Sequence, residues 1–165
     1  MGTDIYLKWD NKIENESKDI STLFSINAGE TGYLRASIGM IRENEFLRYV
    51  FDNKHWQGEE LPFNFNKEQY DKIIKVGLSY VISTTANTDF TLSESTQQQV
   101  EHGNETLKHL GINKLKLTTG TDDLTTLGTD NFRNSITWLN SLLNFYELGM
   151  SLQNDNKNPR IYISW

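Results

Sequence analysis

Arg35 has surroundings that suit the recognition of an anion. It ends the segment Gly32-Tyr33-Leu34-Arg35, in which a glycine turn precedes a tyrosine. A guanidinium group in such a place binds a carboxylate or a phosphate through two parallel hydrogen bonds. The alternative, which we favour, is a structural ion pair, for which the 22 Asp and Glu residues of the chain supply partners. Asp4 and Tyr6 would meet Arg35 if the segments that carry them are neighbours.

His55 and Trp56 form a second candidate site. They lie in an irregular stretch before Pro62. In a loop, a histidine supplies an acid or a base near neutral pH, and a tryptophan stacks on a ligand. The alternative, which we again favour, is structural: Trp56 fills the edge of the core and His55 covers it.

His102, Glu105 and His109 have the spacing of metal ligands on one helix face, within about 60° of one another. The apolar residues of the same segment, such as Val100 and Leu107, point the other way. The row therefore predicts a solvated helix face, with a metal site as the alternative.

The motifs that define common cofactor-dependent and hydrolytic enzymes are missing from the chain. It has no GxGxxG, no phosphate-binding glycine loop, no HExxH and no GxSxG. The absence of cysteine excludes a thiolate nucleophile, a disulfide and a Cys-ligated metal. Asp122, Asp123 and Asp130 lack the spacing of a calcium loop, and Thr129 or Asp130 is expected to cap the helix that follows. We therefore expect no cofactor.

The two ends of the chain predict the elements that must position these residues. Residues 4–9 and the last seven residues both alternate apolar and polar side chains, as strands do. They are near copies, Ile-Tyr-Leu-Lys-Trp and Ile-Tyr-Ile-Ser-Trp, in which the isoleucine, the following aliphatic residue and the tryptophan share one face. We expect both strands in one sheet.

Helices are predicted over 43–52, 67–83 and 131–149, and a further helix follows the capping box Thr91-Leu92-Ser93-Glu94 and ends at Gly111. Residues 20–27 and 113–119 have weaker strand patterns. The prediction is a single α+β domain over residues 1–165, with three or four helices packed on a small sheet that includes both terminal strands.

Composition excludes several classes of protein. A chain of 165 residues that is 36% hydrophobic and 12% aromatic has enough apolar side chains for a core. Its net charge of −6 speaks against a nucleic-acid partner, and no apolar run is long enough to span a membrane. The start of the chain has no signal-peptide pattern. We expect an acidic, soluble, cytoplasmic protein from a bacterium or a phage.

Three motifs together resemble a family of small bacterial and phage-associated proteins for which no activity is known. They are the initial Met-Gly-x-Asp-Ile-Tyr-Leu-x-Trp, the internal Gly32-Tyr33-Leu34-Arg35 and the final Ile-Tyr-Ile-Ser-Trp. Similar proteins carry histidines just before the internal motif, where this chain has Asn27-Ala28-Gly29-Glu30. The resemblance implies no activity, and it nominates a common surface of Asp4, Tyr6, Trp9, Gly32, Tyr33 and Arg35.

Two functions compete on these grounds. The first is a non-catalytic binding or interaction protein of the phage accessory, inhibitor or immunity type, whose partner is a protein, because acidity steers association with a basic protein. The second is a small hydrolase-like enzyme, in which Tyr6, Arg35 and His55 converge around a buried carboxylate. The full candidate surface is Asp4, Tyr6, Trp9, Gly32, Tyr33, Arg35, His55 and Trp56.

Overall fold

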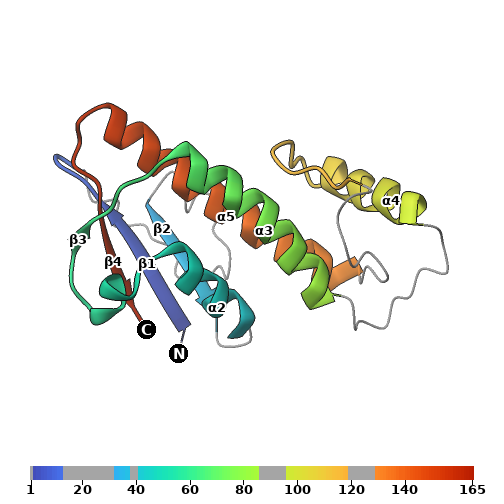
Figure 1. Ribbon diagram of the computed structural model, residues 1–165, viewed down its shortest axis with the longest axis horizontal. Helices are drawn as coiled ribbons and strands as arrows, with labels where there is room; N and C mark the ends of the chain where they lie inside the picture. Colours follow the sequence, from blue (N-terminus) through green and yellow to red (C-terminus); the bar gives the residue numbers. More distant parts are fainter. Residues whose placement is uncertain (1, 13–31, 38–40, 86–95, 119–128) are drawn as a thin grey trace. The chain divides into compact units, whose positions relative to one another are not determined.

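The computed structural model describes residues 2–12, 32–37, 41–85, 96–118 and 129–165. In this part of the chain, four helices and a four-stranded antiparallel sheet form an α+β fold (Figure 1). The predicted fold class is confirmed. The predicted strand over 20–27 and the capping box at 91–94 lie outside the described residues.

The sheet is built from the two strands that the ends of the chain predict, with a further strand on each side. Its order is β2-β1-β4-β3, where β1 is Gly2–Lys8, β2 is Tyr33–Ser37, β3 is Leu61–Pro62 and β4 is Arg160–Ser164. Ile5 pairs with Ile163 and Tyr6 pairs with Tyr162 across the central β1–β4 pair. The similar ends of the chain are therefore direct neighbours.

Alternation along these strands separates a buried face of the sheet from a polar face. Ile5, Leu7, Ile161 and Ile163 are fully buried. Trp165, which was expected to share this face, is instead 71% exposed. It lies beyond the end of β4, and its indole Nε1 donates to the backbone carbonyl of Trp56 at 2.9 Å.

The described residues form two compact units, 1–71 with 141–165, and 72–140. The first unit contains the sheet, the helix α2 (Ile41–Val50), the 3-10 helix η1 (Asn53–Gln57), the start of α3 (Lys67–Thr85) and the end of α5 (Thr129–Asn154). The prediction of a single domain stays a prediction.

The core of the first unit is rich in aromatic rings. Phe63 lies 4.6 Å from Phe65 and 5.2 Å from Phe51, measured between ring centroids. Phe145 and Tyr146 of α5 complete this cluster and are fully buried. The helix α3 begins where Asn66 Oδ1 accepts a hydrogen bond from the backbone N–H of Gln69 at 2.8 Å, as an N-cap does.

The second unit contains α4 (Thr96–His109), and it corrects one prediction. No strand forms over the described part of 113–119. Leu115 and Leu117 are buried, which produces the alternation, but the side chain of Asn104 is the partner of Leu117. Its amide donates to the carbonyl of Leu117 at 3.0 Å and accepts from its N–H at 2.8 Å. As expected, α4 ends before Gly111, which adopts a φ of +71°.

None of the helices in the described ranges is both long and apolar enough to cross a membrane.

Candidate functional site

Asp4, Tyr6, Tyr33 and Arg35 come together on the polar face of the sheet. The register of β1 and β2 places Asp4 opposite Arg35 and Tyr6 opposite Tyr33. Tyr33 donates its hydroxyl hydrogen to Asp4 Oδ1 at 2.7 Å, and an Arg35 guanidinium nitrogen lies 3.5 Å from the same oxygen. Arg35 therefore forms the ion pair within the chain that the sequence analysis favoured.

The electrostatics of this cluster hold its groups in their ordinary protonation states. Burial raises the pKa of Tyr33 to about 12, and its hydrogen bond to the Asp4 carboxylate adds to the effect. Burial also raises the pKa of Tyr6, with a contribution from Asp4. The hydrogen bond with Tyr33 and the charge of Asp4 raise the pKa of Arg35. At neutral pH the phenols of Tyr6 and Tyr33 stay neutral and the guanidinium of Arg35 stays charged.

Tyr162 extends this cluster onto a third strand. The rings of Tyr33 and Tyr6 lie 5.4 Å apart, and those of Tyr6 and Tyr162 lie 6.0 Å apart. We call these three side chains the tyrosine row. Tyr6 and Tyr162 are half-buried, and Tyr33 is buried. The sequence analysis did not nominate Tyr162, although the repeated Ile-Tyr pair at the two ends places Tyr6 and Tyr162 on the same face.

A network of ion pairs lies beside the tyrosine row at the end of the β1–β4 pair. Arg160 donates from Nε to Glu60 at 2.6 Å and from a terminal nitrogen to Asp10 at 2.9 Å. The Lys8 ammonium lies 3.3 Å from Glu60. The hydrogen bond from Arg160 lowers the pKa of Glu60, and the same bond raises the pKa of Arg160. The two positive charges of Lys8 and Arg160 therefore match the two negative charges of Asp10 and Glu60.

Gly32 and Trp9 are positioned together at the start of β2. The backbone of Gly32 has a φ of +71°, and a Cβ there would lie 2.7 Å from the carbonyl oxygen of Leu7 and 2.8 Å from the Trp9 ring. Only glycine fits this turn. The Lys12 ammonium lies 4.4 Å from the centroid of the Trp9 ring. These contacts support a structural role for both residues.

His55 and Trp56 lie on η1, away from Arg35. The Nε2 atom of His55 is 3.3 Å from the carbonyl oxygen of Pro62 in β3, whereas Arg35 is on β2, at the other edge of the sheet. Trp56 is buried, its Nε1 donates to the carbonyl of Phe51 at 3.2 Å, and the Arg48 guanidinium stacks 4.2 Å from its ring centroid. The convergence of Tyr6, Arg35 and His55 that the hydrolase-like hypothesis requires is not formed.

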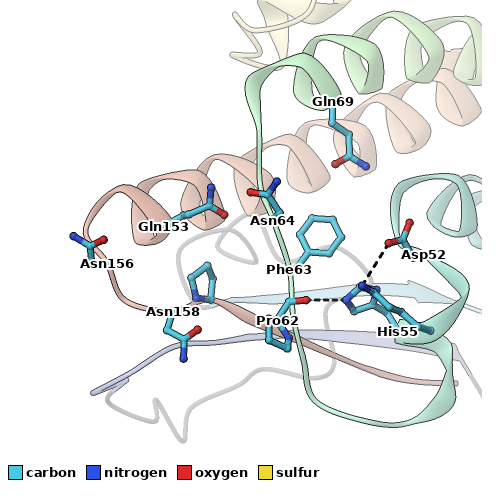
Figure 2. Close-up of a pocket in the computed structure, with 11 residues that line it drawn as sticks. Asp52, His55, Pro62, Phe63, Asn64, Gln69, Gln153, Asn156 and Asn158 are labelled. Atoms are coloured by element: carbon cyan, nitrogen blue, oxygen red, sulfur yellow. Dashed lines mark hydrogen bonds and ion pairs between the residues drawn. The ribbon is translucent and has the colours of Figure 1, made fainter.

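A pocket of about 540 Å³ lies beside His55. Figure 2 shows Asp52 and His55 on one side of it, and Gln153, Asn156 and Asn158 on the other, with Phe63 between them. The pocket joins η1, the segment 62–64, the first turn of α3 and the turn that leads from α5 to β4. We call it the amide pocket, because five of its side chains are amides: Asn64, Gln69, Gln153, Asn156 and Asn158.

Hydrogen bonds from α5 fix the wall of the amide pocket. The side-chain amide of Gln153 makes two hydrogen bonds to the backbone of Phe65. Its oxygen accepts from the N–H of Phe65, and its nitrogen donates to the carbonyl of Phe65, each at 2.9 Å. The Tyr146 hydroxyl donates to Gln69 at 2.6 Å and accepts from the backbone N–H of Asn66 at 3.0 Å. No periodic sequence pattern joins residues so far apart in the chain, which explains why sequence reasoning missed the pocket.

The row of His102, Glu105 and His109 lies on α4. His102 is half-buried, while Glu105 and His109 are exposed. Within the described ranges, no group of three or more histidine, aspartate or glutamate side chains is arranged to hold a metal ion.

Comparisons of the chain with family models, with curated proteins and with solved structures gave no match.

Proposed function

We propose that the protein is a non-catalytic binding protein that recognises a protein partner through Tyr6 and Tyr162, the two half-buried members of the tyrosine row. The observation that supports this is the row itself, in which three tyrosines lie side by side across β2, β1 and β4. Tyrosine is among the residues most enriched at the energetic centre of protein interfaces, because it combines a rigid apolar ring with a hydroxyl.

The charged groups around the row favour binding over catalysis. Asp4 is paired with Arg35, and Glu60 is paired with Arg160 and Lys8. A general base or nucleophile would need a group whose pKa is shifted towards neutrality, whereas the pKa values of Tyr6 and Tyr33 are shifted away from it. Paired charges around a central aromatic patch correspond to the polar rim of an interface.

The proposed partner is a basic protein. The whole chain has a net charge of −6, which accelerates encounter with a cationic surface. A phage accessory, inhibitor or immunity protein that acts in the bacterial cytoplasm fits this description.

The test first captures proteins that bind the chain by affinity, and then measures the dissociation constant of the purified partner. The test variant is Tyr162→Ala, and the matched control is Tyr49→Ala, because Tyr49 lies on α2 and is 53% exposed. We expect Tyr162→Ala to weaken binding by at least roughly tenfold, or about 1.4 kcal/mol, and the control to bind like the wild type. Thermal melting checks that both variants fold. Equal binding by both variants, or capture of no protein, contradicts the proposal.

A further inference from the structure

We propose that the amide pocket is a binding site for a neutral saccharide. Its volume of about 540 Å³ lies inside the range of about 300–1,000 Å³ that is typical of small-molecule sites. None of the tyrosine-row residues lines it. The inference is therefore independent of the proposed protein interface.

The charges at the pocket favour an uncharged ligand. Asp52 and Lys54 both line it, and their charged groups lie 3.9 Å apart. A ligand with a net charge would meet one attractive and one repulsive group at nearly the same place, so neither sign is selected.

The amides supply the hydrogen bonds that a saccharide needs. A side-chain amide donates and accepts, and so does each hydroxyl of a sugar. Gln69 and Gln153 already bond to the protein. The side-chain amides of Asn64, Asn156 and Asn158 are exposed and make no hydrogen bond to any residue in the described ranges. These three amides are open to a ligand.

His55 contributes an imidazole ring to the pocket wall. Its side chain is buried, with 1% of the residue exposed. Its Nε2 atom lies 3.3 Å from the carbonyl oxygen of Pro62. Nδ1 has no hydrogen-bond partner in the described part of the chain.

The remaining wall is apolar and suits the C–H groups of a sugar ring. Pro62, Phe63 and Pro159 line the pocket together. Small-molecule sites commonly combine such an apolar surface with a few polar groups that fix orientation. A saccharide is neutral and has both hydroxyl groups and a C–H face, so it fits the balanced charges, the open amides and the apolar wall of the pocket.

The test uses two asparagines that share a backbone conformation. Asn158 lies at the pocket with a φ of +51°, and Asn11 lies outside it with a φ of +60°. Glycine adopts this conformation without strain. Asn158→Gly therefore removes a pocket amide while the turn is kept, and Asn11→Gly makes the same change elsewhere.

Saturation-transfer NMR and calorimetry on the full chain measure binding of glucose, galactose, mannose, N-acetylglucosamine and maltose. We expect at least one of them to bind, to shift the ring signals of His55, which lines the pocket, and to lose roughly tenfold in affinity in Asn158→Gly but not in Asn11→Gly. Failure of all five saccharides to bind overturns the proposal. Equal affinity in the two variants, or selective binding of inorganic phosphate or triglycine, overturns it as well.

Discussion

The hydroxyl of Tyr33 shows how burial and one neighbouring carboxylate decide the chemistry of a residue. Tyr33 is 4% exposed, and its hydroxyl donates a hydrogen bond to Asp4. Both burial and the nearby carboxylate oppose ionisation, so the pKa of Tyr33 rises to about 12 from the ordinary value of 10.0. The folded protein therefore holds this proton more tightly than the unfolded chain does.

We expect the folded state to lose stability as the pH rises through 10 towards 12. Below pH 10 both states keep the Tyr33 proton, whereas between the two pKa values the unfolded chain releases it first. Tyr33→Phe should make this alkaline decline less steep. At neutral pH it should cost about 1–2 kcal/mol, because the hydrogen bond to Asp4 is lost.

Urea unfolding at pH 7 and at alkaline pH measures both effects. Tyr49→Phe is the control, since Tyr49 is 53% exposed. An alkaline decline that is equally steep in Tyr33→Phe and in the wild type would show that Tyr33 does not contribute to it.

Sequence reasoning at the residue scale found part of the polar cluster and missed the pocket. Arg35 was nominated for the glycine turn and the tyrosine that precede it, Asp4 and Tyr6 for their place on the terminal strand, and Tyr33 by the family resemblance. The amides of the pocket depend on turns such as that at Asn156 and Asn158, whose positive φ values no periodicity reveals. Their meeting with His55 requires the tertiary fold.

At the scale of secondary structure, the end of the helix α5 supplies fully buried residues such as Phe145 and Tyr146 to the core of the first unit. Its pattern predicted 131–149, and the observed helix is longer, Thr129–Asn154. Apolar residues lie around most of its circumference, and Ile136, Leu139, Leu142 and Leu143 among them are fully buried. Its end was harder to predict, because Gln153 is polar and is held by the backbone of Phe65.

Leu143→Ala should destabilise the protein by about 2–5 kcal/mol, since it removes a fully buried side chain and leaves a cavity. Denaturant unfolding monitored by circular dichroism measures this loss. A loss below about 0.5 kcal/mol, as surface substitutions commonly give, would mean that Leu143 is outside the core.

Gly149→Ala should also destabilise the protein, although alanine is the better helix former. Helix propensity alone favours alanine by about 1 kcal/mol. However, a Cβ at Gly149 would overlap the ring of Phe65, and overpacking costs about 1–3 kcal/mol. Ser151→Ala, at an exposed position on the same helix, is the control. Stability of Gly149→Ala at or above the wild-type value would contradict the close approach of α5 to Phe65.

At the element scale, the predicted strand over 113–119 failed for a physical reason. Burial of Leu115 and Leu117 gives the same alternation as a strand in a sheet. The hydrogen bonds that a neighbouring strand would make to Leu117 come instead from one side chain, that of Asn104.

At the scale of the whole molecule, the sheet depends on its last strand. β4 lies between β1 and β3, so it is the only strand of the four that pairs with both of them. The similar ends of the chain predicted the pairing of β1 with β4. The positions of β2 and β3 were not predictable, because β3 has only two residues and no pattern of its own.

A chain that ends at Asn158 should lose the cooperative unfolding of the first unit. It lacks β4, and therefore leaves β1 and β3 without their common neighbour. The control is a chain that ends at Ser164, which lacks only the exposed Trp165 and its bond to Trp56. Calorimetry and hydrogen exchange measure the difference. If the β1 amides of the shorter chain were still protected from hydrogen exchange, the sheet would not depend on β4.

The central position of β4 also means that the sheet can be completed only late in translation. The ribosome produces β1, β2 and β3 long before residues 160–164, and contacts so distant in sequence form slowly. Until those residues are made, Ile5 and Leu7 of β1 lack one of their two neighbouring strands. The nascent chain then exposes unpaired strand edges and apolar side chains. The edges of β1 and β3 that β4 covers in the folded protein are therefore open to aggregation during that interval.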